Sequence, residues 1–345
     1  MKSTFALAIL GLAVVATPAS AQKMTLNVLG QPLATGLIQK NLEQPFFENF
    51  AERTGLDIKA NYKAIDVTGM KSEETLRLLK NGLFDIVSIR TAQAARDEPF
   101  LLGQDLVGLN PDYDTSRRVY ERYKVYFDQR LQENFNSKLL GLWPFGPQVL
   151  FCKPEIKGLK DIKGLKVRVY DQSLAQFIES LGATPVAIGF SETQQALSRG
   201  VVDCAITGAS SANSAGWPEV SEYFMAIGFQ VGFNGYAINL NTWNKLTADE
   251  QKKLESAING LNADIWIYSK ELFDDALRCN VGEEPCTTVT KYKMKNVPVT
   301  EEDLKLVANA VSTISFPAWS EVCEKSMKGC GAQWKQILGG MLGMK

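Results

Sequence analysis

Residues 159–203, LKDIKGLKVRVYDQSLAQFIESLGATPVAIGFSETQQALSRGVVD, decide the fold that we predict for this chain. Three short apolar runs in and just after this stretch predict strands, at residues 166–170, 184–188 and 201–206. Two amphipathic segments between them predict helices, at residues 173–181 and 191–199. Gly182 and Gly200 follow these segments, as glycine commonly does at a helix C-terminus. The repeated β-α order indicates a mostly parallel sheet covered by helices.

The same alternation continues over the rest of the chain. Further strands are expected at residues 24–29, 56–62, 84–89, 139–143, 148–152, 236–240 and 288–297. Further helices are expected at residues 37–53, 72–81, 115–134, 247 to about 278, and 300–327. Two α/β domains accommodate this number of elements more simply than one.

Two segments rich in proline and glycine, residues 144–147 and 228–235, predict where the chain crosses between these domains. The predicted first lobe consists of residues 22–145 plus 234–273, and the second of residues 146–233 plus 274–330. Residues 331–345 are then a C-terminal tail. Two lobes joined by extended crossovers form a cleft that can close by hinge motion.

The composition excludes several classes of function. Lys plus Arg number 37 and Asp plus Glu number 38, so the formal net charge is -1 and gives no sign of nucleic-acid binding. The chain has no histidine, which excludes Ser-His-Asp and Cys-His catalysis and histidine-based zinc sites. What remains is carboxylate, lysine or tyrosine chemistry, or binding without catalysis.

The first 21 residues have the pattern of a secretory signal peptide. Lys2 precedes an apolar run at residues 5–16, which is too short to span a bilayer. Pro18 ends the run, and residues 19–21 (ASA) fit a cleavage site. We expect residues 1–21 to be removed on export. No later stretch has the length of a transmembrane span, so no direct membrane insertion is expected.

Six cysteines fit an exported protein. Neighbours in sequence meet most often, so we expect two disulfides, Cys279–Cys286 and Cys323–Cys330. Cys152 and Cys204 each lie in a strand-like run, and they pair if those strands are neighbours or otherwise remain buried thiols. Without histidine or CxxC spacing, no metal site is expected.

The order of short motifs in the opening stretch resembles the DctP family of substrate-binding proteins for TRAP transporters. The matching stretches are residues 164–169 (GLKVRV), 181–186 (LGATPV), 190–192 (FSE) and 196–203 (ALSRGVVD). The resemblance implies an α/β, two-lobed periplasmic binding protein fold with hinge-linked domains and a long helix spanning both lobes. It also implies a periplasmic location and an organic anion as ligand.

Arg168 is the first candidate for the ligand site, because the family's arginine at this motif position commonly pairs with the ligand carboxylate. The residues themselves favour the same role. A guanidinium between Val167 and Val169 is costly to bury unpaired, and its planar fork suits a carboxylate or a sulfonate. In the alternative interpretation, Arg168 pairs with an acid of the protein itself or faces solvent.

Gln148 marks a departure from the family. Many members have a second anion-binding arginine about 20 residues before the first, where this chain has Gln148. An amide offers hydrogen bonds but no charge. This departure argues against a dicarboxylate and favours a monocarboxylate or a sulfonate with hydroxyl or amide groups. Gln148 is otherwise an ordinary polar strand residue.

Residues beyond the strand ends are further candidates, because ligands of open α/β sheets bind there. Thr207, Ser211 and Asn213 follow the strand at residues 201–206, with simple turn chemistry as the alternative. Trp217 either walls the pocket or packs in the core.

The other lobe supplies candidates by the same rule. Arg90 follows the strand at residues 84–89 and is either a second cation of the site or one partner of a surface ion pair. Gln31 follows the first strand, and Asn234 and Tyr236 lie at the second crossover.

We therefore expect a binding protein without a cofactor, rather than an enzyme, that captures a small organic anion. The resemblance implies delivery to the small and large membrane subunits of a TRAP transporter. The alternatives are the binding protein of an ABC importer or of a sensor system, and an exported enzyme that uses a pair of carboxylates.

Overall fold

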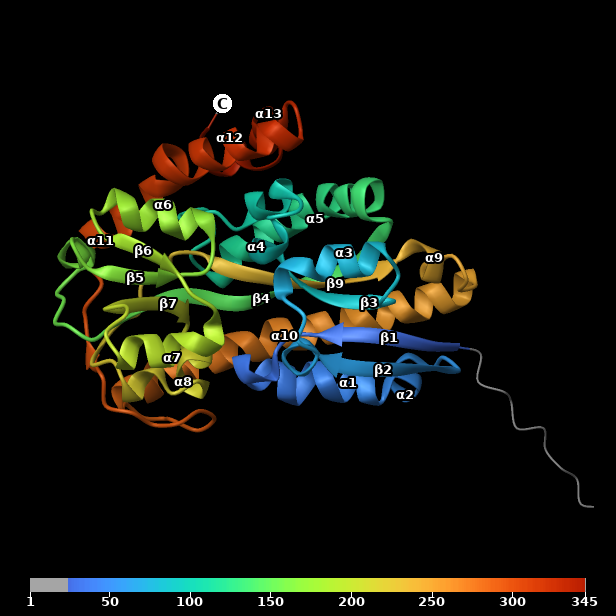
Figure 1. Cartoon of the computed structure of the whole chain (residues 1–345), viewed down its shortest axis with the longest axis horizontal. Coiled ribbons are helices and arrows are strands. Elements are labelled where there is room, and N and C mark those ends of the chain that lie inside the picture. The colour runs from blue at the N-terminus through green and yellow to red at the C-terminus, as the bar shows by residue number, and fades with distance from the viewer. Residues whose placement is uncertain (1–23, 345) are drawn as a thin grey trace, which may run out of the picture.

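The protein, described over residues 24–344 by a computed structural model, has a mixed sheet shared by two lobes (Figure 1). The strand order is β2-β1-β3-β9-β4-β7-β5-β6. The strands span Met24–Gly30 (β1), Ile58–Ala64 (β2), Ile86–Arg90 (β3), Ser137–Cys152 (β4), Lys166–Val169 (β5), Thr184–Ala187 (β6), Cys204–Gly208 (β7), Tyr223–Met225 (β8), Val231–Asn239 (β9) and Lys295–Asn296 (β10). The predicted α/β, two-lobed class is confirmed, while the predicted signal peptide lies outside the described residues.

Strand β4 joins the two lobes. It pairs with β9 from Ser137 to Pro147 and with β7 from Gln148 to Cys152. The prediction of two separate strands at residues 139–143 and 148–152 is therefore wrong. Register shifts at Leu139/Gly141 and Pro144/Gly146 accommodate the prolines and glycines without ending the strand. Both β4 and β9 run antiparallel to their neighbours, so the parallel pairing that we predicted holds only among the other strands.

In the first lobe, helices cover both faces of the β2-β1-β3-β9-β4 sheet. The helices on one face are α1 (Gln44–Glu48), α2 (Phe50–Thr54) and most of α10 (Ala248–Val281). Those on the other face are α3 (Thr75–Lys80), α5 (Tyr113–Phe135), α12 (Phe316–Ser326) and α13 (Cys330–Leu338). Successive side chains of β3 point to opposite faces of the sheet. Ile86 packs with α10 on one face, and Val87 packs with α5 on the other.

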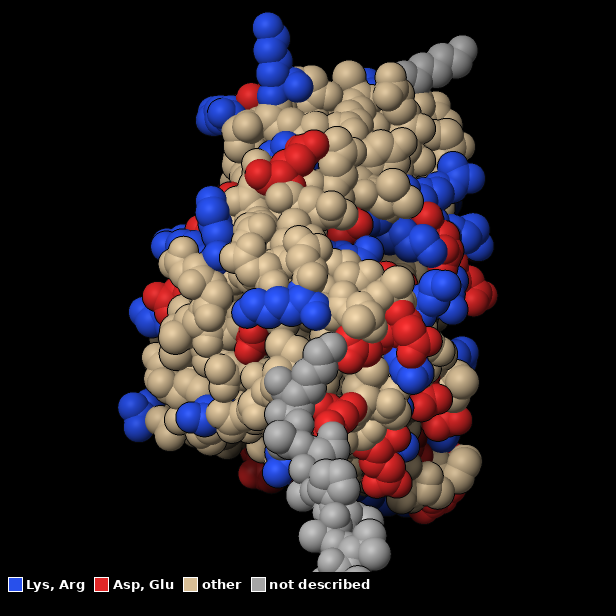
Figure 2. Space-filling model, turned by 90° about the vertical axis from the view of Figure 1, so that its right-hand side faces the viewer, with Lys and Arg blue, Asp and Glu red and all other residues tan. Residues whose placement is uncertain are grey.

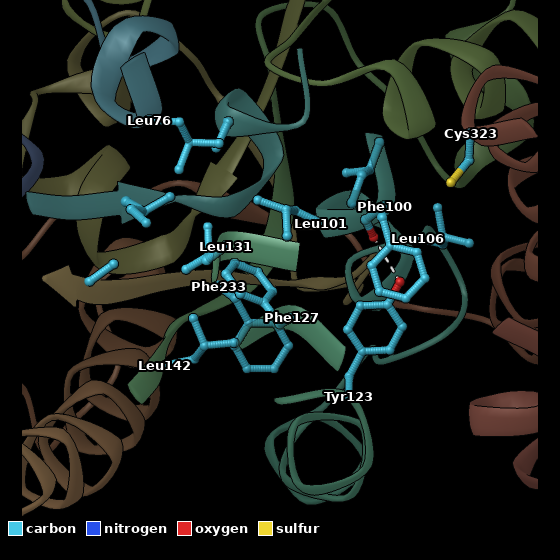
Figure 3. Close-up of a cluster of buried hydrophobic side chains, with 14 of the residues drawn as sticks. Leu76, Phe100, Leu101, Leu106, Tyr123, Phe127, Leu131, Leu142, Phe233 and Cys323 are labelled. Carbon is cyan, nitrogen blue, oxygen red and sulfur yellow. Dashed lines mark hydrogen bonds between the residues drawn. The ribbon is translucent and has the colours of Figure 1, made fainter. Parts of the chain in front are cut away.

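Figure 3 shows part of the core on the α5 side, where the side chains of Phe127, Leu131 and Leu142 meet. In the same core, the hydroxyl of Tyr123 donates to the backbone oxygen of Phe100 at 2.7 Å. This bond satisfies a polar group that would otherwise be buried without a partner.

In the second lobe, all the strands and helices predicted from residues 159–203 are present, although β7 begins at Cys204 rather than at residue 201. The helices are α6 (Gln172–Ser180), α7 (Phe190–Ser198), α8 (Ala209–Ser214) and α11 (Glu301–Ala310). Two short helices, α4 (Thr91–Ala94) and α9 (Leu240–Trp243), complete the elements of the first lobe.

The long helix α10 spans both lobes, as predicted. Thr247 and Glu250 form a capping box at its start, and Gly282 ends it with a positive φ of 83°. Leu254 and Leu272 pack in the core of the first lobe, and Ala276 packs in the second. The helix therefore forms a third connection between the lobes beside β4 and the return into β9.

The segment after α10 is held by a carboxylate rather than by a sheet. Oδ2 of Asp275 accepts the backbone N–H groups of Thr288 and Val289 at 2.8 and 3.1 Å, and Oδ1 accepts that of Thr287 at 3.0 Å. These donors are then unavailable to a neighbouring strand. The predicted strand at residues 288–297 is wrong except for the two residues of β10.

The predicted helix at residues 300–327 is interrupted. Helix α11 passes into a π-helical turn, Val311–Ser315, and α12 begins beside Pro317, which cannot donate a backbone hydrogen bond. Helices α12 and α13 then pack on the first lobe, where Trp319 and Trp334 join its core. The residue boundaries of the lobes and of the C-terminal tail stay predictions.

All six cysteines are paired. The predicted disulfides Cys279–Cys286 and Cys323–Cys330 are present. Cys152 and Cys204, whose state was open, also form a disulfide. Their strands β4 and β7 are neighbours with these two residues in register, and their Cα atoms lie 4.1 Å apart.

Over residues 24–344, no helix combines the length and the apolar character that crossing a bilayer requires. Figure 2 shows one face of the molecule, on which basic and acidic side chains are interspersed without a continuous basic surface. This distribution agrees with the near-zero net charge.

Replacing Trp334 tests whether α13 is part of the folded core. Its indole is fully buried, and Nε1 donates to the backbone oxygen of Gly103. Trp334→Ala should lower the free energy of unfolding by about 3–5 kcal/mol, as measured by urea denaturation. The exposed Gln336→Ala is the matched control and should change it by less than about 0.5 kcal/mol. If Trp334→Ala lowers the free energy of unfolding no more than Gln336→Ala does, α13 does not contribute to the folded core.

The Asp275 carboxylate gives a pH-dependent prediction. Burial raises the pKa of Asp275, but the hydrogen bonds from residues 287–289 outweigh burial and hold that pKa below its usual value. A lowered carboxyl pKa stabilises the fold above the unfolded pKa of about 3.9, and this contribution is lost as the pH falls through the folded pKa. Asp275→Asn should lower the free energy of unfolding by about 1–3 kcal/mol at pH 7 and by progressively less below about pH 4. Urea denaturation at each pH measures this difference. If wild type and Asp275→Asn differ in the free energy of unfolding by the same amount at every pH, the lowered pKa of Asp275 is contradicted.

Candidate functional site

A cavity lies where the two lobes meet, and its unfilled space, part of which is open to solvent, is about 470 Å³. The first lobe and the crossing strands line it with Arg90, Ala92, Gln93, Asp105, Phe145, Gln148, Gly232, Phe233 and Asn234. The second lobe lines it with Arg168, Tyr170, Phe190 and Thr207. A wider cavity of about 1280 Å³ adjoins it, shares Arg168 and Tyr170 with it, and reaches Trp319 of α12.

Arg168 is buried at the centre of this site with 3% of its surface exposed. Its Nε donates to the backbone oxygen of Ile188 and its Nη1 to that of Ile206, both at 2.9 Å. The guanidinium lies 5.7 Å from the ring of Trp217 and 5.8 Å from that of Tyr170. Among the described residues it forms no ion pair with a carboxylate.

The charge of Arg168 is therefore incompletely balanced. Burial lowers its pKa to about 10, and the positive charge of Arg90 acts in the same direction. The group is still a cation near neutral pH. Backbone carbonyls and aromatic faces offset part of the cost of burying that charge, and the nearby Asp171 raises the pKa of Arg168, but no carboxylate of the described residues forms an ion pair with it. An anionic ligand would supply the negative charge that balances Arg168.

Arg90 lies at the end of β3 and faces the same cavity from the other lobe. Its Nε donates to Oε1 of Gln31 at 2.5 Å, and its Nη2 is buried without a partner. The guanidinium also lies 5.3 Å from the ring of Phe145. Burial lowers the pKa of Arg90 to about 10. It forms no ion pair within residues 24–344, so the surface ion pair that was one alternative is not formed.

Asp105 is a carboxyl on the cavity wall that the sequence analysis did not select. It is fully buried, and its Oδ2 accepts hydrogen bonds from the Thr91 hydroxyl and the Phe233 backbone N–H, both at 3.1 Å. Burial raises the pKa of Asp105 to about 8. An acidic residue inside the otherwise apolar run LLGQDLVGL at residues 101–109 was the available signal.

Asp171 is a second acid near the site and lines the adjoining wider cavity. Its Oδ1 caps helix α6 by accepting the Leu174 backbone N–H at 2.8 Å, and its Oδ2 accepts Nε2 of Gln230 at 2.7 Å. Burial raises the pKa of Asp171 to about 6. Both of its oxygens therefore have partners within the protein.

Of the predicted site residues, the cavity brings together Arg168, Arg90, Gln148, Thr207 and Asn234. The amide nitrogen of Gln148 donates to the Gly146 backbone oxygen at 2.7 Å. The aromatic walls at Tyr170, Phe145, Phe190 and Phe233 were not selected, because an aromatic residue in a sequence is usually part of a core.

The other predicted residues lie behind the cavity wall. Gln31 holds Arg90, and Trp217 is buried against Arg168. Asn213 ties α8 to α10 through a bond to Asn280, and to the segment after α10 through a bond to the backbone oxygen of Thr290. Tyr236 is buried in the first-lobe core, and Ser211 is buried on α8. For each of these residues, direct contact with a ligand stays a prediction.

Comparison with known proteins places this geometry in a family. A sialic acid-binding periplasmic protein, SiaP, of Vibrio cholerae is 25% identical over 207 residues, which are 59% of this chain and 60% of that protein. The solved structure of DctP6 from Bordetella pertussis, an extracytoplasmic solute receptor binding pyroglutamic acid, has a TM-score of 0.76 at 21% identity and covers 90% of this chain and 99% of that one.

A third protein has the same fold. A TRAP periplasmic solute-binding protein from Desulfovibrio salexigens with bound orotic acid has a TM-score of 0.77 at 16% identity, covering 92% of this chain and 99% of that one. The family model named DctP, described as bacterial extracellular solute-binding protein, family 7, matches residues 36–278. This chain therefore belongs to the DctP family of bacterial extracellular solute-binding proteins, as the motifs in residues 159–203 predicted.

Proposed function

We propose that this chain captures a small organic acid outside the cytoplasm and delivers it to the small and large membrane subunits of a TRAP-type secondary transporter. The observation that carries the proposal is the pair of buried guanidinium groups, Arg90 and Arg168, which come from opposite lobes and line one cavity. Neither forms an ion pair with a carboxylate of the described residues. A ligand carboxylate between them would supply the missing negative charge.

The cavity walls support an acid with an apolar body. Phe145, Phe190 and Phe233 offer aromatic faces, and Thr207 and Asn234 offer hydrogen bonds. Arg90 supplies a positive charge that Gln148 cannot, so the site balances more negative charge than Arg168 alone would. The relatives and solved structures compared above carry the names of sialic acid, pyroglutamic acid and orotic acid, all of which are carboxylic acids.

Capture works by closure rather than by catalysis in this proposal. The lobes are joined by β4, by the return into β9 and by α10, which form three neighbouring connections. A ligand that touches Arg168 on one lobe and Arg90 on the other stabilises the closed arrangement through its differential affinity. The proposed location is the periplasm, after cleavage of residues 1–21.

Removing the central guanidinium tests the proposal. Organic acids, among them pyroglutamate, lactate, malate, orotate and succinate, are screened by thermal shift, because a ligand of the folded state raises its melting temperature. Arg168→Ala should weaken the best binder by about 100-fold or more in calorimetry, since truncating a buried charge partner costs about 2–5 kcal/mol.

The matched control is Lys166→Ala, two residues away on the same strand but exposed. It should retain wild-type affinity, and circular dichroism should show both variants folded. Wild-type affinity in Arg168→Ala would remove the anchoring role of Arg168. Failure of every organic acid to raise the melting temperature would count against the proposed function.

Gln148 tests how the cavity sets the charge of its ligand. Gln148→Arg adds a third guanidinium to the cavity wall and should improve the affinity for malate or succinate relative to lactate by about 10-fold in calorimetry. Gln148→Met, of similar length but uncharged, is the control and should leave that ratio near its wild-type value. An unchanged ratio in Gln148→Arg would place residue 148 outside ligand contact.

A further inference from the structure

The cavity between the lobes contains one feature that carboxylate binding does not use. Asp105 is the only carboxyl among the described residues that line it, opposite two cations. When it is ionised, a carboxyl in a site for an anion works against affinity unless it meets another part of the ligand. Asp105 therefore needs a role of its own.

One oxygen of the Asp105 carboxyl is held by two hydrogen bonds. Thr91, the residue after Arg90, donates its hydroxyl to Oδ2, and so does the backbone N–H of Phe233 on the crossing strand β9. These two bonds tie Oδ2 to the residue after Arg90 and to the strand that connects the lobes.

The other oxygen, Oδ1, is buried and has no hydrogen-bond partner. The side chain of the neighbouring Asn110 interacts with this carboxyl and lowers its pKa, but its Nδ2 donates to the backbone oxygens of Gln104 and Val231, each at 3.2 Å, and its own Oδ1 is also buried without a partner. A buried acceptor without a donor is costly. Asp171 differs in this respect, since both of its oxygens accept bonds from the protein.

We propose that Asp105 is a specificity-determining residue that accepts a hydrogen bond from the ligand, so that the preferred solute is an organic acid with an N–H or O–H group near its carboxylate. This inference rests on the proposed function. The two guanidiniums take the carboxylate, and Oδ1 of Asp105 takes the donor. Acids of the same shape that place an acceptor or a carbon there leave Oδ1 unpaired and bind more weakly.

The protonation state of Asp105 decides whether it accepts a hydrogen bond from the ligand or donates one to it. Burial raises its pKa to about 8, so without a ligand the carboxyl carries a proton much of the time near neutral pH. A ligand donor at Oδ1 favours the ionised form. A protonated Asp105 that stayed protonated would instead donate to the ligand and favour acids with an acceptor at this position.

Matched ligand pairs separate these cases. The probes are pyroglutamate against the lactone in which its ring N–H is replaced by oxygen, lactate against propionate, and malate against succinate. Calorimetry on the wild-type chain should give a preference of about 10- to 100-fold for the donor-bearing acid in at least one pair.

Asp105→Asn tests the residue itself. The amide oxygen can keep the bonds from Thr91 and Phe233, which places an N–H₂ donor where Oδ1 was. The variant should lose the preference or reverse it, with an unchanged melting temperature in the absence of ligand. Asp171→Asn is the control and should leave the ratio of affinities within each pair unchanged.

The outcomes distinguish this inference from the proposed function. If organic acids bind but no pair shows a donor preference, or the acceptor-bearing acid is preferred, the role of Asp105 is overturned and the function stands. The same holds if Asp171→Asn lowers the ratio as much as Asp105→Asn, because net charge would then explain it. If no organic acid binds at all, both proposals fail.

Discussion

The guanidinium of Arg168 is buried on strand β5, and it forms no ion pair with a carboxylate of the described residues. Two backbone oxygens and two aromatic rings accommodate the guanidinium without neutralising it. Arg90 approaches from the other lobe in a similar state, and the two positive charges oppose one another across the cavity. The two guanidinium groups thus concentrate positive charge where the lobes meet, which an anionic ligand would offset.

The strand that carries this constraint belongs to both lobes. Strand β4 pairs with β9 in the first lobe and with β7 in the second, and the change of partner falls between Pro147 and Gln148. Because the cavity lies where the lobes meet, residues next to this change of partner line it. Asp105 and Thr91 are held against β9 by hydrogen bonds to Phe233. One pair of strands thus orients the anion site and the neighbouring carboxyl together.

The sequence was informative where local pattern and burial agree. The strand and helix alternation of residues 159–203, the capping box of α10 and the role proposed for Arg168 all follow from residues near one another in the chain. It was less informative where a distant group replaces a local partner. Residues 287–289 have strand-like composition, yet the Asp275 carboxylate takes their backbone donors. Asp105 escaped selection because its position on the same cavity wall as Arg90 and Arg168 depends on contacts between distant segments.

By itself, the sequence determined the fold class, the two-lobed organisation, the two local disulfides and the family, because helix periodicity, caps and short loops depend on residues close together in the chain. Only the tertiary structure decided that β4 is one strand shared by both lobes, that Cys152 meets Cys204, and that α12 and α13 return to the first lobe. It also decided that Arg90, Arg168 and Asp105 line one cavity. Contacts of this kind join residues far apart in the chain, and their partners are chosen by the packing of whole elements rather than by any local pattern.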